Sequence, residues 1–264
     1  GFLLAGQALA TTRRLRVGIS VLVAFPRSLM NVAFASWDLQ RLSGGRFELG
    51  LGTQIKQNIE DRYSARWLPP AAGMREYLGA LRAIFHSFRT REPLNFVGEY
   101  YRFTRLQPFF NPGPIDAPDV PIMLGAVGPK MLNLVGEAAD GMHTHPTNTS
   151  ARYLREAILP QVAAGAARRA PGLPPPMICA NELVASGPDD ATVGFERERF
   201  RGMLAFLFST PAYWPSLELF GWQDIGERLL QMTREGRWQE MPSLLSDAVV
   251  DEFLPAARGI EMAV

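Results

Sequence analysis

One turn of the sequence combines glycine, proline and lysine in the order that suits an anion site. The segment Leu124–Lys130 (LGAVGPK) follows an apolar run and precedes a helical pattern. Gly125 and Gly128 let the backbone approach a ligand closely, and Pro129 fits the first turn of a helix. The free N–H groups at a helix start and the charge of Lys130 both favour an anion. The turn therefore predicts a phosphate site, with an ordinary glycine-containing βα turn as the alternative.

Two further segments carry residues that could border a flat ring. In the apolar run Val17–Phe25, Ser20 and Val21 could face an aromatic cofactor, and an ordinary core strand is the alternative. In the next apolar segment, Gly52 suggests a close backbone approach and Thr53 would sit at the mouth of the strand. The C-terminal ends of parallel strands line the ligand site in α/β folds, so we expect these residues to line one.

Two of the three histidines lie close together at the end of another apolar run. His143 and His145 are two positions apart in Gly141–His145, so in a strand they would point the same way. A zinc site would need a third ligand, which neither His86 nor Cys179 is placed to supply, so no metal site is predicted. We expect His145 to contact a ligand or to do acid–base work, with a packed or solvated histidine as the alternative.

Composition and missing motifs argue against several classes of function. The net charge of +1 argues against a nucleic-acid partner. Walker loops, dinucleotide fingerprints in a strand–helix setting and G-x-S-x-G elbows do not occur. We expect no membrane partner, because no apolar run reaches the roughly 20 residues that cross a bilayer. The single cysteine, Cys179, is expected to be a buried structural thiol and suits a reducing cytoplasm.

Five apolar runs predict buried parallel strands separated by amphipathic helices. The runs lack strict alternation, as expected for strands covered on both faces. The strands are expected at Val17–Phe25, Phe47–Gly52, Val120–Gly125, Gly141–His145 and Met177–Ala185. The helices are expected at Ser28–Leu42, Ala71–Phe88, Lys130–Ala139, Ala151–Arg168 and Asp190–Phe208. The alternation implies right-handed βαβ units in one α/β domain over residues 1–264, either a barrel or a doubly wound sheet.

Other segments fall outside this alternation. Phe96–Phe103 indicates a short hairpin with its turn at Val97–Glu99, and Pro108–Pro118 is rich in proline and glycine, as loops are. The tail Thr210–Val264 is expected to be helical and irregular. The opening residues, Ala5–Thr12, have the character of the middle of a helix, as in a fragment or a trimmed chain.

Taken in order, four motifs resemble the luciferase-like monooxygenase family, especially its branch that uses coenzyme F-420. The likeness runs from about Arg13 to Ser209 and continues more weakly to the end. Each motif is common by itself, and the ordered set is specific. The motifs are Val17–Leu22 (VGISVL), Leu42–Gly52 (LSGGRFELGLG), Pro121–Lys130 and Gly136–Gly141 (GEAADG).

The resemblance implies a TIM-barrel (β/α)8 fold with the cofactor at the C-terminal mouth. It implies that Ser20–Val21 forms a strand bulge, often with a non-prolyl cis peptide, behind a flavin or deazaflavin ring. The cofactor phosphate would bind at the glycine–proline–lysine turn, and His145 would contact cofactor or substrate. The implied cofactor-binding residues are Ser20, Val21, Gly52, Thr53, Ala126, Val127, Gly128, Pro129, Lys130, Met131 and His145.

Compared with the family's barrel, the first predicted strand corresponds to the third and the last to the seventh. The first two strands and the eighth would then be absent, which gives an incomplete barrel with two open edges. The family's frequent catalytic residue on the second strand would be absent too. His145 is therefore the catalytic candidate, without an assigned role.

The resemblance implies an oxidoreductase that passes a hydride between coenzyme F-420 and a small organic substrate, as a cytoplasmic homodimer. FMN is the alternative cofactor, in a luciferase-like monooxygenase, because both cofactors present a phosphate and a tricyclic ring. A non-catalytic flavin-binding or dimerisation remnant is a further alternative, which the missing strands favour. In the loops Gln54–Pro70 and Glu92–Pro118, the aromatic residues Trp67, Phe109 and Phe110 would form an apolar wall for the substrate, or only pack.

Overall fold

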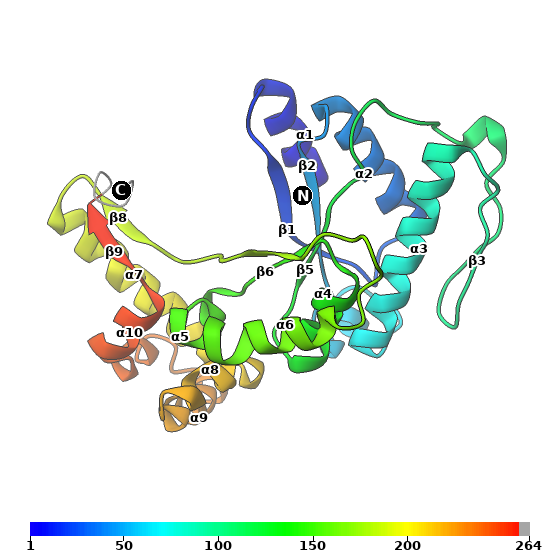
Figure 1. The fold of residues 1–264 in the computed structure, drawn as a ribbon. Helices are drawn as coiled ribbons and strands as arrows, with labels where there is room; N and C mark the ends of the chain where they lie inside the picture. The colour runs from blue at the N-terminus through cyan, green and yellow to red at the C-terminus, as the bar shows by residue number, and fades with distance from the viewer. Residues whose placement is uncertain (259–264) are drawn as a thin grey trace. The chain divides into compact units, whose positions relative to one another are not determined.

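The computed structural model describes residues 1–258, and its internal contacts divide the chain into two compact units. Unit 1 holds Gly1–His143 and Gln161–Ile178. Unit 2 holds Thr144–Pro160 and continues from Cys179. Figure 1 traces the chain and labels the helices and strands.

A five-stranded sheet forms the centre of unit 1, with the strand order β1-β2-β5-β6-β7 (Figure 1). Neighbouring strands from β1 to β6 pair in parallel, as predicted. In the described part of the chain β1 and β7 are the two edge strands, so this sheet is not closed. The strands are β1 (Val17–Val23), β2 (Phe47–Gly52), β5 (Ile122–Gly125), β6 (Gly141–His143) and β7 (Met177–Cys179).

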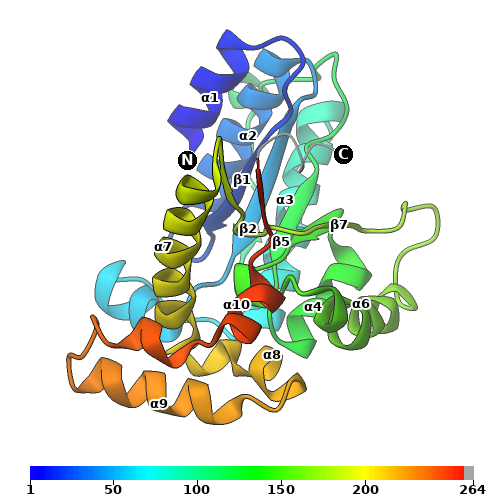
Figure 2. The ribbon, with the colours of Figure 1, turned by 90° about the vertical axis from the view of Figure 1, so that its left-hand side faces the viewer.

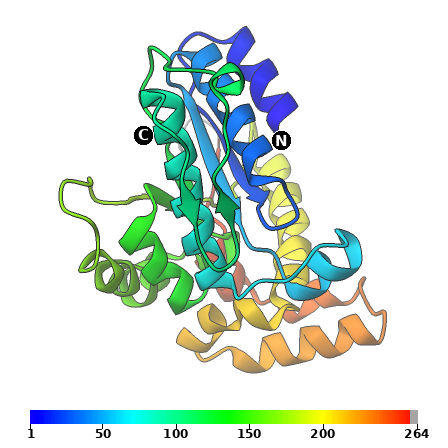
Figure 3. The same ribbon diagram turned by 90° about the vertical axis from the view of Figure 1, so that its right-hand side faces the viewer.

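Helices connect these strands, and Figure 3 shows α3 running in front of them. The apolar stripes of α2 and α3 face each other, where Trp37 stacks on Phe85 with ring centroids 5.6 Å apart. The indole N–H of Trp37 donates to the carbonyl of Gly113 at 3.0 Å, so this buried ring is satisfied. The helices are α1 (Phe2–Thr11), α2 (Leu29–Ser43), α3 (Pro70–Thr90), α4 (Pro129–Ala138) and α6 (Leu159–Ala166).

The glycine–glycine–arginine motif after α2 has a structural role. The helix begins at a cap in which Ser28 accepts from the N–H of Asn31, and it ends at Gly44, whose φ of 63° suits glycine. The guanidinium of Arg46 then donates to the carbonyls of Leu9 and Leu15, at 3.0 and 2.7 Å. Arg46 therefore ties the end of α1 to the start of β2.

Three predicted strands have different ends in the structure. The strand expected at Val17–Phe25 ends at Val23. The one expected at Val120–Gly125 begins at Ile122, because Pro121 has no N–H to donate to the ladder. The one expected at Gly141–His145 ends at His143, because Pro146 opens a 3-10 turn with His145 at its N-cap.

The strand expected at Met177–Ala185 is interrupted. It ends at Cys179, which is half-buried rather than buried, and Asn181 donates its N–H to the hydroxyl of Thr144 at 2.9 Å. The polar pair Asn181–Glu182 breaks the apolar run, so the ladder does not continue. Ala185 opens a separate strand, β8 (Ala185–Gly187), which pairs in parallel with β9 (Ala256–Arg258).

The helix expected at Ala151–Arg168 is broken in the middle. It consists of α5 (Ala151–Tyr153), a π-helical turn (Leu154–Ile158) and α6. Pro160 has no N–H, and in a straight α-helix its ring would clash with the carbonyl four residues earlier. The wider turn, in which Leu159 donates to the carbonyl of Leu154, accommodates this proline.

Unit 2 is mainly helical, with α7 (Asp190–Phe208) where it was predicted (Figure 2). Asp189 caps α7 by accepting from the N–H of Thr192 at 2.8 Å. The tail is mainly helical, as expected, up to Phe253 and ends in β9; its remainder, 259–264, lies outside the described residues. The tail helices are α8 (Trp214–Leu219), α9 (Gln223–Arg234) and α10 (Asp247–Phe253). Their apolar sides close a core that includes Leu204, Phe208, Leu217, Leu229, Val250 and Phe253.

The predicted hairpin is present as β3 (Phe96–Val97) and β4 (Arg102–Phe103), with a later turn than expected. The turn is Gly98–Tyr101, and the carboxylate of Glu76 on α3 accepts three of the N–H groups in it. A contact from another helix therefore sets the turn. None of the helices in residues 1–258 is long and apolar enough to cross a membrane.

Candidate functional site

The C-terminal ends of β1, β2 and β5 meet at one side chain, that of Val21. A Cβ atom added to Gly52 would lie 2.6 Å from Cγ2 of Val21, and one added to Gly125 would lie 3.1 Å from its Cγ1. Carbon atoms in ordinary contact are about 3.5–4.0 Å apart, so only glycine fits comfortably at both positions. Val21 remains 38% exposed, which leaves a small apolar platform at the edge of the sheet.

The platform coincides with an irregularity in β1. The pairing of β1 with β2 shifts register between Ile19 and Leu22, and the peptide bond from Ser20 to Val21 is cis. The bulge and the cis peptide that the resemblance implied are therefore both present, and Ser20 is exposed beside Val21. Thr53 follows β2 directly and is half-buried, which places it at the strand mouth as expected.

The glycine–proline–lysine turn presents unsatisfied backbone donors. Gly128 is the N-cap of α4 and has no side-chain cap. The N–H groups of Val127, Gly128 and Lys130 have no hydrogen-bond acceptor within the part of the chain that the structure describes. A Cβ atom on Gly128 would meet nothing within 4 Å, so the outer side of the turn is open. These features fit a phosphate group, which needs several N–H donors and room to approach them.

The other predicted residues of the turn lie on either side of these donors. Ala126 and Met131 are buried and anchor the two sides of the turn, whereas Pro129 and Lys130 are exposed. Within residues 1–258, the ammonium group of Lys130 takes part in no ion pair. The predicted residues Ala126–Met131 therefore form one continuous structural feature.

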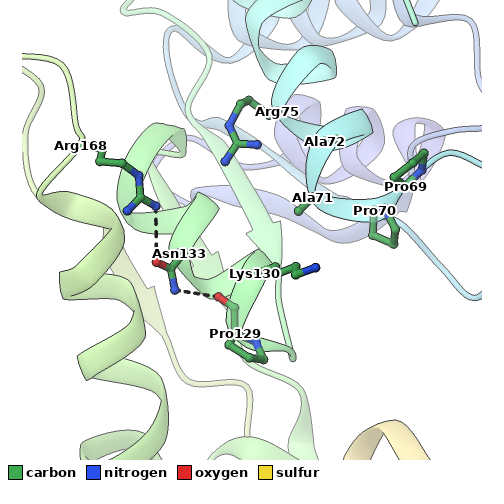
Figure 4. Close-up of a pocket in the computed structure, with 9 residues that line it drawn as sticks. All are labelled: Pro69, Pro70, Ala71, Ala72, Arg75, Pro129, Lys130, Asn133 and Arg168. Carbon is green, nitrogen blue, oxygen red and sulfur yellow. Dashed lines mark hydrogen bonds between the residues drawn. The ribbon is translucent and has the colours of Figure 1, made fainter. Parts of the chain in front are cut away.

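An open groove of about 550 Å³ lies beside this turn (Figure 4). It runs between the starts of α3 and α4, and Figure 4 shows Arg75, Lys130 and Arg168 around it. Arg75 and Arg168 both pair with Glu137, at 2.7 and 3.3 Å. The hydrogen bond from Arg75 lowers the pKa of the Glu137 carboxyl. The lining residues are Pro69, Pro70, Ala71, Ala72, Arg75, Pro129, Lys130, Asn133 and Arg168.

His143 belongs to the sheet. A Cβ atom on Gly50 would lie 3.3 Å from Cδ2 of His143 and 1.9 Å from the carbonyl oxygen of Ile19. The imidazole of His143 therefore packs over β2 where glycine leaves space. Because β6 ends at His143, the strand alternation that would have aligned it with His145 does not continue. Within residues 1–258, no group of three or more His, Cys, Asp or Glu side chains is placed to hold a metal ion.

His145, in unit 2, is held by a short chain of buried hydrogen bonds. Its Nδ1 lies 2.8 Å from the hydroxyl oxygen of Thr147, and that hydroxyl donates to Oδ1 of Asn148 at 2.9 Å. A hydroxyl has one proton to donate, so its oxygen accepts from Nδ1–H of His145. The backbone N–H of Thr147 also approaches Nδ1, at 3.4 Å, a longer and weaker contact than the one of 2.8 Å to the hydroxyl. The chain therefore favours the Nδ1–H tautomer and leaves a lone pair on Nε2.

The environment of His145 keeps its ring neutral. The imidazole stacks flat on the ring of Tyr213, with centroids 4.1 Å apart and planes 7° apart. Burial lowers the pKa of His145 to about 4, because the charged form loses water without gaining a carboxylate partner. A neutral imidazole with a free Nε2 lone pair can accept a hydrogen bond near neutral pH.

The family model for luciferase-like monooxygenases matches residues 1–259. The chain belongs to this family. It is 40% identical over 242 residues to an uncharacterized protein of Mycobacterium tuberculosis strain H37Rv, which covers 92% of this chain and 71% of that one. It is also 37% identical over 141 residues to a putative coenzyme F-420-dependent oxidoreductase of the same strain, which covers 50% of this chain and 40% of that one.

Comparison with solved structures gives the same fold for this luciferase-like protein. The coenzyme F-420-dependent tetrahydromethanopterin reductase from Methanopyrus kandleri matches with a TM-score of 0.69 and 18% identity, over 98% of this chain and 81% of that one. The predicted TIM-barrel type, incomplete and with five recognisable parallel strands, is therefore confirmed. So is the prediction of an oxidoreductase of the luciferase-like family.

Several residues of this luciferase-like protein escaped the sequence analysis. Thr147 and Asn148 lie in a polar run that is nonetheless buried, and only the hydrogen bonds to His145 reveal their role. Arg75 and Arg168 are far apart in the sequence, and no local pattern predicts that they meet. Glu137 belongs to the Gly136–Gly141 motif, but no local pattern shows that it pairs with these two arginines.

The aromatic residues expected in a substrate wall do not gather. Trp67 is half-buried and packs edge-on against Phe25, with centroids 6.1 Å apart. Phe109 and Phe110 pack on each other and are 91% and 59% exposed. The substrate wall therefore stays a prediction for this luciferase-like protein.

Proposed function

We propose that this protein is a coenzyme F-420-dependent oxidoreductase that moves a hydride between the coenzyme and a small organic substrate. The observation that carries the proposal is the anion turn, with three unsatisfied N–H groups and Lys130, next to the Val21 platform. The 37% identity to a putative coenzyme F-420-dependent oxidoreductase supports this choice of cofactor. When bound, the deazaflavin supplies the hydride chemistry at its ring.

The residues of the chain have separate tasks in this proposal. The N–H groups of Val127 and Gly128 and the ammonium of Lys130 hold the cofactor phosphate. Val21 supports one face of the ring, and Gly52 and Thr53 border it. These contacts orient the ring and exclude water from one side of it.

His145 is the catalytic candidate, as an acceptor of a hydrogen bond from the substrate. Its Nδ1–H is fixed by Thr147, so Nε2 is free to accept a hydrogen bond from a substrate hydroxyl, whereas a pKa of about 4 makes the ring too weak a base to hold a proton at neutral pH. Since the lowered pKa of His145 keeps the ring neutral, this acceptor is present throughout the neutral pH range.

A titration of the purified chain with coenzyme F-420 and with FMN, followed by quenching of tryptophan emission, tests the proposal. We expect saturable binding of F-420. Lys130→Gln should weaken it roughly fivefold, the loss expected for one exposed charge contact. Gly128→Val should weaken it further by filling the open side of the turn. Lys56→Gln, at the other lysine of the chain, is the matched control and should leave the Kd unchanged.

The two cofactors separate the alternatives. If FMN bound saturably and F-420 did not bind, the proposed cofactor would change from a deazaflavin to a flavin. The assignment of its phosphate to the anion turn would remain. If Lys130→Gln and Lys56→Gln changed the F-420 affinity equally, the assignment of the phosphate to this turn would be wrong. If neither cofactor bound, the proposed function would have to be abandoned for this chain.

A further inference from the structure

The groove beside the anion turn carries more positive charge than one phosphate requires. Arg75, Lys130 and Arg168 line it, whereas the described residues that line it include no Asp or Glu (Figure 4). The one carboxylate paired with these cations, Glu137, offsets a single charge and leaves a net charge of about +2. The groove therefore suits an anion with more than one charge.

The backbone adds to this charge. The helix α3 has 21 residues and begins at Pro69 and Pro70, without a side-chain cap. The N–H groups of Ala71 and Ala72, which line the groove, have no acceptor among residues 1–258. The start of α4 opens onto the same groove at Pro129. Two uncapped helix starts thus supplement the three side-chain cations.

A structural role for the arginines accounts for only part of the arrangement. The pairs of Arg75 and Arg168 with Glu137 tie the neighbouring helices together. However, Arg75 uses its Nε and one Nη on Glu137, and its side chain remains 48% exposed. The side chain of Arg168 is 54% exposed, and Lys130 takes no part in this ion-pair network. Arg75 keeps its second Nη group and Lys130 its ammonium group for a ligand, whereas Arg168 also donates to the carbonyl of Ala164 and to Oδ1 of Asn133, at 3.3 and 3.4 Å, and contributes mainly its charge.

We propose that this groove binds the carboxylates of the glutamyl tail that coenzyme F-420 carries beyond its phosphate. The inference rests on the proposed function, because the groove begins at Pro129 and Lys130 of the phosphate turn. A flexible chain with several carboxylates matches a row of cations and N–H donors. FMN ends at its phosphate and would leave Arg75 and Arg168 without a ligand.

The test compares two forms of the coenzyme, one with several glutamyl residues and one with none. Dissociation constants for the chain are measured by tryptophan quenching at low and at high salt. At low salt we expect the glutamylated form to bind roughly three- to tenfold more tightly, as two or three exposed charge contacts would give. High salt should reduce this preference, because it screens exposed charges.

Two variants of opposite charge change sharpen the test. Arg168→Gln should reduce the preference for the glutamylated form about two- to fivefold. Glu137→Gln should increase the preference, because it removes the carboxylate that competes with the tail. If the ion pairs served only to hold the fold together, Glu137→Gln would not increase the preference for the glutamylated form. Arg14→Gln, an exposed arginine outside the groove, is the control, and thermal unfolding of each variant checks that it is folded.

The outcomes separate the two proposals. Equal affinity for both forms of the coenzyme would overturn the groove assignment and leave coenzyme F-420 as the cofactor. A preference that neither Arg168→Gln nor Glu137→Gln alters would also overturn it, because the tail would then bind elsewhere. Failure of both forms to bind would remove the proposed function itself, and the groove assignment with it.

Discussion

Replacing Gly52 with alanine tests whether the Val21 platform depends on the glycines beside it. The new Cβ atom would lie 2.6 Å from Cγ2 of Val21, about 0.9 Å short of the 3.5 Å at which carbon contacts begin to be favourable. Gly125 on β5 flanks the other side of Val21, where an added Cβ atom would lie 3.1 Å from Cγ1, so little space separates Val21 from that strand. We therefore expect the side chain to move outward, toward the proposed ring site.

The structure sets the size of the effect on stability and of the effect on coenzyme binding. Overpacking of this kind costs about 1–3 kcal/mol of unfolding free energy, and we expect about 1–2 kcal/mol because Val21 is partly exposed and can yield. A displaced Val21 side chain should weaken the binding of coenzyme F-420 by about 1 kcal/mol, which raises its Kd roughly fivefold. Urea unfolding gives the first quantity, and the quenching titration gives the second.

Two further variants control this prediction. Gly18→Ala, on the same strand pair, adds a Cβ atom at 3.5 Å from that of Glu48 and should change stability by less than about 0.5 kcal/mol. Adding Val21→Ala to Gly52→Ala should recover part of the lost stability, because the clash is removed. The reasoning is refuted if Gly52→Ala is as stable and binds as tightly as the original chain, or if the two changes are simply additive.

Three further predictions concern the other residues of the site and its support. The pKa of His145 is about 4 in the folded chain and 6.5 for an exposed histidine, as in the unfolded chain. The contribution of the neutral ring to the free energy of unfolding should therefore be complete above pH 6.5 and decrease as the pH falls toward 4. Urea unfolding at several pH values should show a smaller decrease for His145→Gln. Thr147→Val should cost about 1–3 kcal/mol by leaving two buried polar groups without partners. Nitrogen-15 NMR should show the His145 tautomer changing in that variant and kept in Thr147→Ser. Arg46→Gln should lower the unfolding free energy by about 2–3 kcal/mol, because Arg46 donates to several carbonyls, and thermal unfolding should show a much smaller change for the exposed Arg41→Gln.

Local patterns in the sequence were enough to predict the elements that carry the site. The apolar runs gave the five parallel strands, and the glycines after α2 gave the end of that helix, because both depend on neighbouring residues alone. The anion turn Ala126–Lys130 was predictable for the same reason, since its donors and its glycine lie within one turn of chain. The ordered motifs around these elements also identified the family.

The tertiary structure decided which residues share a site. The space that holds Val21 is left by Gly52 and Gly125, on two other strands, and it depends on the register in which these strands pair. The groove needs Arg75 on α3 and Arg168 in the turn after α6, and these two segments meet only when the chain is folded. The spacing of residues in the sequence contains no information on the distance between such segments in the folded chain. The ends of strands and the starts of helices, by contrast, follow from the backbone donors and the side-chain size at each position. For this protein the sequence by itself therefore determined the turn to which we assign the phosphate, and packing between distant segments determined its neighbours.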